Sequence, residues 1–426
     1  MSNSQTAFFF VKEFRIFAPM KQPLILCDAS GIDNLYPLTL TRPGWDLRMG
    51  IFTQRERWTY WLDNQEVFGK ASSYLASFFD HLPVQERVIL INSAVFPDKE
   101  VIRCMEALSP STYFVTKDGD WLMAELTLSQ LVSTDSPIST DLLEKWGLKG
   151  EQVSVTPLII RYPEEIFRHN GEIIQRDFPL AARIFSQTSV KDPYTRIYGA
   201  DNLFVSEGAN IKAAIINAEE GPIFIGPEAK VSEGAIIARP HAICAHATVA
   251  MGAKLRGDTT LGPWCKAGGE VSNSVMMGYS NKGHDGYLGN SVLGYWCNLG
   301  ADTNNSNLKN NYAEVKLWHY RTQRFRKTGL QFAGLIMGDH SKCAINTMFN
   351  TGTVVGVSAN IFGAGFPRNF VPSFSWGGAS GMQVYMAKKA IEVARIVKER
   401  RNLRLTTEEA DILKAVFEHT AQYRRF

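Results

Sequence analysis

The chain has 426 residues, with 45 lysines and arginines against 42 aspartates and glutamates, and 45% of its residues are hydrophobic. This length exceeds what one hydrophobic core serves and predicts two or three domains. A net charge of +3 gives no sign of a polyanionic partner, so we expect no nucleic-acid binding. No apolar run has the length of a membrane span, and the six cysteines stand singly, which favours reduced thiols in a cytoplasmic protein.

Residues 21–195 are predicted to form a mixed α/β domain that follows a short leader. The leader, residues 1–20, is interpreted as dispensable and disordered, because a second methionine, Met20, stands just before the first strand-like run. Short apolar runs bounded by polar residues suit buried parallel strands, and longer apolar stretches suit helices. We therefore expect strands at 24–27 and 88–92, helices at 47–68 and 71–79, and a helical linker at 162–178 with a hairpin-like Asn170-Gly171.

Aliphatic residues recur at every sixth position in the middle of the chain. The series is Ile225, Val231, Ile237, Ile243, Val249, Leu255 and Leu261. Four residues after each member stands a mostly small residue: Ala229, Ala235, Ala247, Ala253, Thr259 and Cys265, with His241 as the exception. A period of six fits neither an α-helix nor a hairpin and is typical of the hexapeptide repeat of a parallel β-helix. Its aliphatic residues point inward, so stacked coils bury a column that one repeat could not bury alone.

The parallel β-helix is predicted to occupy residues 196–378. The alternative, an accidental alternation in a β-sandwich strand, is disfavoured because sandwiches need turn signals every 8–12 residues or so. An irregular segment interrupts the repeat at 303–330. Residues 379–426 are predicted to be a helical tail, whose last helix opens at Thr407 with a capping residue and which is expected to cap the open end of the β-helix.

Polar residues gather where the repeat loses its regularity. Lys282, His284 and Tyr287 lie close together, and Asn298 follows fourteen residues after the histidine. Imidazole titrates near neutral pH and can deprotonate an amine nucleophile, while tyrosine and asparagine supply fixed hydrogen bonds to an anionic sugar. On these residues alone a loop histidine with only a backbone contact remains the alternative.

This run, continued by Asn298-Leu-Gly-Ala-Asp-Thr303 and Asn311-Tyr312, resembles the acetyltransferase domain of the bifunctional uridylyltransferase/acetyltransferase family that makes UDP-N-acetylglucosamine. The resemblance covers about 220–365 and implies a left-handed β-helix, a homotrimer and a site between subunits. It implies that His284 is the general base that deprotonates the amino group of glucosamine-1-phosphate as it attacks acetyl-CoA. The residues expected to bind the substrate are Arg256, Lys282, Tyr287, Asn298, Asn311 and Tyr312.

The sequence departs from that family at two active-site lysines. Ser272 stands in place of one and Leu317 in place of the other, and Asn311-Tyr312 come about four positions late. The amino-sugar substrate and the acyl group therefore stay open. The basic arm, residues 304–327, is expected either to grip the phosphates of coenzyme A or a nucleotide sugar, or to pack on a neighbouring subunit.

The start of the α/β domain, from Leu26 to Pro43, together with the following Asp46-Leu-Arg48-Met-Gly50, resembles the sugar nucleotidyltransferase family related to that bifunctional enzyme. The resemblance implies a Rossmann-like fold, a sugar-1-phosphate, a nucleoside triphosphate and Mg²⁺. Only Gly31 is available for a phosphate loop, so binding of the nucleotide phosphates is expected of Arg42 and Arg48, unless both are structural. The metal ligands are unknown, with Asp28 and Asp46 as candidates.

Three functions fit the sequence. The first is an enzyme of nucleotide-sugar biosynthesis, with a nucleotidyltransferase-like domain and a β-helix that transfers an acyl group from a coenzyme A thioester to an amino-sugar phosphate or nucleotide sugar. The second is a nucleotidyltransferase that uses UTP or dTTP and whose β-helix only forms trimers. The third is a non-catalytic protein that binds sugar nucleotides. For all three we expect a homotrimer without a membrane partner.

Overall fold

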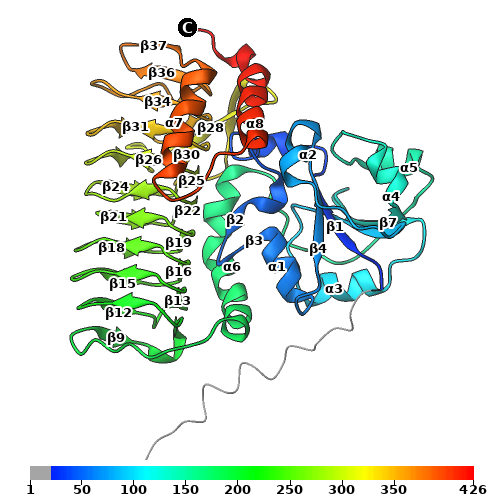
Figure 1. The fold of residues 1–426 in the computed structure, drawn as a ribbon, viewed down its shortest axis with the longest axis horizontal. Coiled ribbons are helices and arrows are strands. Elements are labelled where there is room, and N and C mark those ends of the chain that lie inside the picture. Colours follow the sequence, from blue (N-terminus) through cyan, green and yellow to red (C-terminus); the bar gives the residue numbers. More distant parts are fainter. Residues whose placement is uncertain (1–20) are drawn as a thin grey trace, which may run out of the picture.

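The computed structural model describes residues 21–426, and the predicted leader lies outside the described residues. A tall stack of short strands stands beside an α/β domain, and two C-terminal helices pack between them at one end (Figure 1). Helix α6 (Pro163–Ile184) runs along the boundary of the two bodies. The predicted fold class is confirmed: an α/β domain, a left-handed parallel β-helix and C-terminal helices.

A six-stranded sheet forms the centre of the α/β domain. Its strand order is β4-β1-β5-β7-β6-β8, and β7 runs antiparallel to both of its neighbours. Two strands predicted from the sequence are present as β1 and β5, which pair in parallel. The strands are β1 (Leu24–Cys27), β4 (Val67–Lys70), β5 (Arg87–Asn92), β6 (Thr112–Val115), β7 (Trp121–Thr127) and β8 (Lys149–Gln152). The helices around them are α2 (Ser73–Phe79), α3 (Lys99–Glu106), α4 (Leu128–Val132) and α5 (Thr140–Lys145).

The single helix predicted at 47–68 is wrong. This stretch instead holds two short antiparallel strands, β2 (Arg48–Met49) and β3 (Phe52–Thr53), then helix α1 (Gln54–Trp61) and the start of β4. Thr53 fixes the start of α1 through a capping box with Glu56. Asp63 and Asn64 adopt positive φ angles after its end, which no helix continues through. Apolar density therefore indicated burial here, but not helix.

Three mainly parallel sheets build the β-helix; the coils from β9 to β24 contribute one strand to each, and the later coils continue only the first two sheets. Face 1 consists of β10 (Leu203–Val205), β13 (Ile223–Ile225), β16 (His241–Ile243), β19 (Thr259–Leu261), β22 (Val275–Gly278), β25 (Val292–Tyr295), β30 (Leu335–Met337), β33 (Thr353–Val355) and β35 (Phe370–Val371). Face 2 consists of β11 (Asn210–Ile211), β14 (Lys230–Val231), β17 (Thr248–Val249), β20 (Lys266–Ala267), β23 (Asn281–Lys282), β26 (Asn298–Leu299), β31 (Lys342–Cys343), β34 (Asn360–Ile361), β36 (Ser375–Gly378) and the antiparallel β37 (Gly381–Val384). Face 3 consists of β9 (Arg196–Tyr198), β12 (Ile215–Asn217), β15 (Ile236–Ala238), β18 (Lys254–Arg256), β21 (Glu270–Ser272) and β24 (Tyr287–Gly289).

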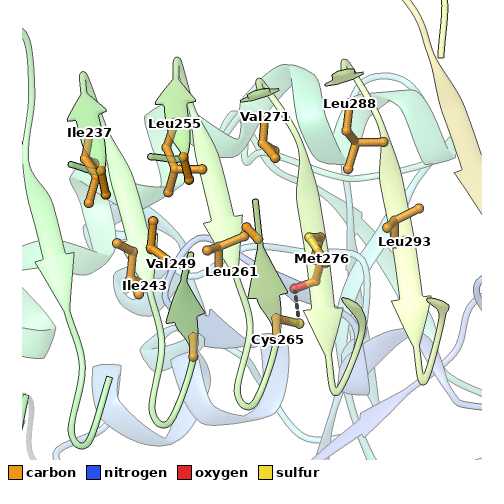
Figure 2. Packing of buried hydrophobic residues seen from close by; sticks show 14 of the residues in the cluster. Ile237, Ile243, Val249, Leu255, Leu261, Cys265, Val271, Met276, Leu288 and Leu293 are labelled. Atoms are coloured by element: carbon orange, nitrogen blue, oxygen red, sulfur yellow. Dashed lines mark hydrogen bonds between the residues drawn. The ribbon is translucent and has the colours of Figure 1, made fainter. Parts of the chain in front are cut away.

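The six-residue series forms the core of the β-helix, as predicted. All seven aliphatic members are buried and belong to one hydrophobic cluster. Figure 2 shows the five members from Ile237 to Leu261 with their side chains turned into the interior, where the Cys265 thiol also donates to the carbonyl of Met276. Members 18 residues apart pair directly, as Ile225 does with Ile243. Three six-residue units therefore make one coil.

Face 1 is buried on its outer side as well. Its strands β13 and β16 are buried at every residue, whereas β15 and β18 of face 3 alternate between buried and exposed positions. Phe204 and Phe224 point outward from face 1 and pack with Ile174 and Leu180 of α6 in one cluster. A strand that is covered on both sides is apolar throughout, whereas a strand with one side exposed to solvent alternates between apolar and polar residues. The α/β domain is thus fixed to one side of the β-helix.

The predicted hairpin at Asn170-Gly171 is wrong, because both residues lie inside α6. The Asn170 amide accepts a hydrogen bond from the Gly50 backbone and donates to the carbonyl of Asp258. A Cβ atom on Gly171 would stand 2.2 Å from the carboxyl carbon of Asp258. Gly171 thus lets the helix approach the β-helix closely, a packing role that outweighs the weak helix propensity of glycine.

The irregular segment and the tail both fold back on the molecule. After β27 (Asn304–Asn305), which pairs with β32 (Met348–Phe349), comes a hairpin of β28 (Lys316–His319) and β29 (Arg324–Lys327). Arg326 of the hairpin forms an ion pair with Glu164 of α6. The tail forms α7 (Ala387–Glu399) and α8 (Thr407–His419), and the residue that caps α8 is Thr406 rather than Thr407. In part, the basic arm therefore packs on the protein's own α/β domain.

Candidate active site

His284 lies on a loop at the corner between faces 2 and 3. The loop, residues 283–286, lies over the Gly268-Gly269 corner of the preceding coil. A Cβ atom on Gly268 would stand 2.5 Å from the carbonyl oxygen of Gly283, and one on Gly286 would stand 2.2 Å from that of Thr303. Glycines thus allow three coils to stack tightly here, which holds the histidine on a closely supported turn.

Lys282, one residue from that loop, supports it from inside. Its side chain is buried, and its ammonium donates to the carbonyl oxygens of Gly268, His284 and Asp285 at 3.2, 2.6 and 3.0 Å. Burial lowers the pKa of Lys282 to about 8. The substrate contact expected of Lys282 stays a prediction, but the geometry gives this lysine the role of tying the His284 turn to the coil below.

A cavity of about 820 Å³ opens beside His284. Its lining runs along the corner over several coils and includes Met251, His284, Asp285 and Ile345. His284 is exposed, and among the described residues no side chain or backbone group hydrogen-bonds its imidazole ring. Met251 and Ile345 are 75% and 66% exposed, so the cavity has exposed apolar side chains beside the imidazole ring. The hexapeptide pattern gave no sign of these two residues, because both lie outside the repeated columns.

Two predicted substrate-binding residues lie together on face 3. Arg256 of β18 forms an ion pair with Glu270 of β21, and Glu270 stands next to Tyr287 of β24 in the register. The phenol oxygen of Tyr287 accepts a hydrogen bond from the side chain of Asn307 at 3.0 Å. Arg256 and Tyr287 thus share one surface, and Tyr287 lies three residues from His284 around the corner.

The other predicted substrate-binding residues lie elsewhere. Asn298 projects from face 2, where it pairs with Asn281 of the preceding coil. Asn311 and Tyr312 lie on the segment before the β28–β29 hairpin, and Tyr312 is 66% exposed. None of these three lines the cavity beside His284. Their roles in substrate binding stay predictions, and the extra residues before Asn311 account for its displacement along the chain.

In the α/β domain, the crevice where a nucleotide would be expected is closed. In open α/β sheets ligands bind beyond the carboxyl ends of the strands where the strand order reverses, here between β1 and β5. Asp28 and Ser93 follow these strands, and the Asp28 carboxylate accepts hydrogen bonds from the Ser93 hydroxyl at 2.7 Å and the Gly44 amide at 2.9 Å. The cavity that remains there, bordered by Gly44 and Ser93, measures about 30 Å³, which is room for a water molecule but not for a nucleotide.

Both arginines assigned to the nucleotide have protein partners. Buried Arg48 donates to the carbonyl of Ile51 and to Glu56. Arg42 forms ion pairs with Asp46 and with Asp339 of the β-helix, the latter at 2.7 Å, and its guanidinium lies 3.7 Å from the centre of the Tyr295 ring. These contacts agree with the alternative stated above, in which both arginines are structural. Phosphate binding by either arginine stays a prediction.

The residues present do not fit a magnesium site. Asp28 is hydrogen-bonded within the protein, and burial raises its pKa to about 6. Asp46 is paired with Arg42. Within residues 21–426, no three acidic, histidine or cysteine side chains are grouped as a metal ion would require. In that same range no helix is both long enough and apolar enough to cross a bilayer.

Comparison with known proteins agrees with this two-part organisation. Residues 24–184 match the family model described as sugar nucleotidyl transferase. No protein of curated function matches the chain in sequence.

Solved structures to which the chain is similar include three described as an acetyltransferase, an acyltransferase and an N-acyltransferase. The polySia-specific acetyltransferase NeuO is 16% identical, with 46% of this chain and 84% of that chain covered and a TM-score of 0.25. The UDP-N-acetylglucosamine acyltransferase from Campylobacter jejuni is 10% identical, with 54% and 96% covered and a TM-score of 0.28. A mutant of the N-acyltransferase AntD from Bacillus cereus, in complex with dTDP-4-amino-4,6-dideoxyglucose and coenzyme A, is 11% identical, with 51% and 94% covered and a TM-score of 0.20. At these values the likeness concerns the β-helix as a fold.

Proposed function

We propose that the protein transfers an acyl group from a coenzyme A thioester to the amino group of a sugar phosphate or nucleotide sugar, with His284 as general base. The observation that carries this proposal is the free imidazole of His284 on a supported turn beside a cavity of about 820 Å³. Imidazole is the side chain suited to deprotonate an amine near pH 7. The apolar Met251 and Ile345 give the cavity walls that suit a thioester arm.

The chemistry needs only groups that this corner supplies together with its substrates. The amino nitrogen attacks the thioester carbonyl carbon and forms the new C–N bond, His284 removes the ammonium proton, and the C–S bond breaks. The thiolate then leaves as free coenzyme A after it takes up the proton that the histidine holds. Arg256, on the adjacent face, carries a positive charge that attracts the phosphate of the acceptor, although it is already paired with Glu270.

The test is the release of free thiol from acetyl-CoA with a panel of amino-sugar phosphates and amino-sugar nucleotides. We expect His284→Asn to lower the rate by about 100-fold or more, because a positioned general base contributes that much. The matched control is His246→Asn, since His246 is also an exposed histidine at a β-helix corner but lies outside this cavity. Full transfer by His284→Asn would refute the proposal.

A second candidate, nucleotidyl transfer by the α/β domain, is favoured by the family match over residues 24–184. The crevice between β1 and β5 argues against nucleotidyl transfer, because it has no room for a nucleotide. Incubation with UTP or dTTP and sugar-1-phosphates, with and without added Mg²⁺, decides between the two through pyrophosphate release. If ligands bind but neither thiol nor pyrophosphate is released, the protein is the non-catalytic sugar-nucleotide binder.

We further propose that the active form is a homotrimer. Exposed apolar side chains such as Met251 and Ile345 flank the cavity and would be covered by a neighbouring subunit. Light scattering coupled to size exclusion measures the molar mass, and a monomer at assay concentration would exclude a shared site.

A further inference from the structure

A second cavity lies where the α/β domain, the β-helix and the C-terminal helices meet. This junction cavity measures about 310 Å³ and lies on the corner between faces 1 and 2, whereas His284 lies on the corner between faces 2 and 3. Arg42 comes from the α/β domain, Trp296 and His340 from the β-helix, and Lys398 and Leu403 from the tail. No residue lines both cavities. The two sites are therefore separate.

Aromatic residues form a column along this corner. His246 stacks on Trp264 and Tyr279 on Trp296, each with ring centroids 4.2 Å apart, and His340 continues the column beyond Trp296. All five have positive φ angles, at which these large residues are uncommon and for which glycine or asparagine is the usual choice. Of the five, Tyr279, Trp296 and His340 line the junction cavity.

The charged groups around the cavity are paired with one another within the protein. Arg42 is paired with Asp46 and Asp339, and Lys398 is paired with Glu409. Two cations thus face three carboxylates, so a phosphate or another anion would meet repulsion here. Two of the aromatic rings at the wall already carry a cation, because Arg42 lies over Tyr295 and Lys398 over Trp296. An uncharged ligand fits this arrangement best.

Two features of the wall indicate a ligand rather than a packing defect. The Nδ1 atom of His340 is shielded from solvent and has no hydrogen-bond partner. Burial lowers the pKa of His340 to about 3, so the ring that lines the cavity is neutral. Phe78, at the end of α2, also lines the cavity and leaves 42% of its surface exposed. A neutral imidazole ring and an exposed aromatic wall therefore occur together here.

We propose that the junction cavity binds an uncharged saccharide ring. Each sugar hydroxyl is both a donor and an acceptor, so it can bond the guanidinium of Arg42 and the carboxylate of Asp46 without excess charge. The C–H face of a sugar packs on the apolar walls formed by Phe78 and Leu403. A volume of about 310 Å³ stands at the low end of small-molecule sites and suits one ring rather than a nucleotide sugar. A sugar bound in the junction cavity would contact the tail, the α/β domain and the β-helix at once.

The test is saturation-transfer NMR on the full-length protein with glucose, N-acetylglucosamine and inorganic phosphate as separate probes. For a ligand with about a dozen heavy atoms we expect a Kd of about 1 mM for at least one sugar. Leu403→Trp fills the cavity from its rim and should weaken binding by about tenfold or more. The matched control is Ile396→Trp, because Ile396 is exposed on α7 and does not line the cavity.

Further variants keep the outcome unambiguous. Phe78→Ala removes an exposed side chain, so the protein should fold and bind the sugar several-fold more weakly. His284→Asn should bind it unchanged, which separates this site from the proposed acyl-transfer site. The proposal would be overturned if neither sugar bound at a concentration of about 20 mM. It would also be overturned if the sugar bound equally well to the wild type and to Leu403→Trp. A third contrary result would be phosphate binding to the wild type that Leu403→Trp abolishes and the other variants keep.

Discussion

Replacing Asp28 by asparagine should stabilise the protein at neutral pH. Burial raises the pKa of this carboxyl from 3.8 to about 6, so its ionised form is disfavoured in the folded state. The stability that protonation brings is fully present below pH 3.8 and is lost as the pH rises through about 6. The difference in pKa corresponds to a penalty of about 3 kcal/mol at pH 7.5.

Asparagine keeps the shape and the acceptor oxygen but not the charge. The Ser93 hydroxyl and the Gly44 amide can still donate to its side-chain oxygen, although each bond is weaker to a neutral group. We therefore expect a net gain of about 1–2 kcal/mol, which raises the apparent melting temperature of the α/β domain by about 2–8 °C. The advantage should shrink towards zero as the pH falls to about 4, because Asp28 is then protonated in the folded wild type and increasingly so in the unfolded one.

The assay is thermal unfolding of both proteins from pH 4 to 8. The control is Asp118→Asn, because Asp118 is exposed and its replacement should leave the melting temperature within 1 °C or so at every pH. A destabilised Asp28→Asn at pH 7.5 would refute the reasoning. If Mg²⁺ with UTP stabilised the wild type but not Asp28→Asn, the carboxylate would instead be a metal ligand and nucleotidyl transfer would regain support.

Three further predictions follow from packing and from the His284 turn. Ile237→Ala should cost about 3 kcal/mol of unfolding free energy, whereas Ile236→Ala, on the 41% exposed neighbour, should cost less than about 1 kcal/mol in the same denaturant titration. Gly171→Ala should destabilise the protein although alanine favours helices, and Gly171→Ala combined with Asp258→Gly should recover part of the loss in melting temperature. Lys282→Met should lower the rate of thiol release, because the turn that carries His284 loses the three hydrogen bonds of the ammonium group. Circular dichroism should show that the variant stays folded. An unchanged rate would show that the turn keeps its conformation without Lys282.

The sequence predicted the β-helix well because one physical requirement repeats every six residues. Each inward position, such as Ile237 or Leu255, is fully buried and must be aliphatic. The helix predicted at 47–68 failed for a different reason. Residues there are apolar because they pack against α6 and face 1, as Met49 packs near Ile173 and Met277. Apolar residues that are buried by distant segments show no regular spacing along the chain. Their positions therefore could not indicate whether residues 47–68 form a helix or strands.

The candidate site was predictable only in part. His284 could be proposed from the sequence because its motif is local, and the loop that carries it packs closely on the neighbouring coils, while its role stays a prediction. The inward direction of Lys282 could not be read from the chain, since outward and inward positions alternate and the turn shifts the register. The junction cavity depends on contacts such as that of Arg42 with Asp339, which lie almost 300 residues apart. Such contacts leave no pattern in a single sequence.

The way in which the α/β domain is fixed to the β-helix limits where chemistry and assembly can occur. Helix α6 and the loop that closes the nucleotide crevice cover face 1, whose strands are buried on both sides. Faces 2 and 3 keep exposed outward positions, as at Lys230 and Lys254. A neighbouring subunit that packs on the β-helix would therefore meet these two faces rather than face 1, and the corner between them carries His284. The same loop that closes the crevice in the α/β domain holds Arg42 at the junction cavity, so we expect this domain to contribute to ligand binding there rather than through a nucleotide site of its own.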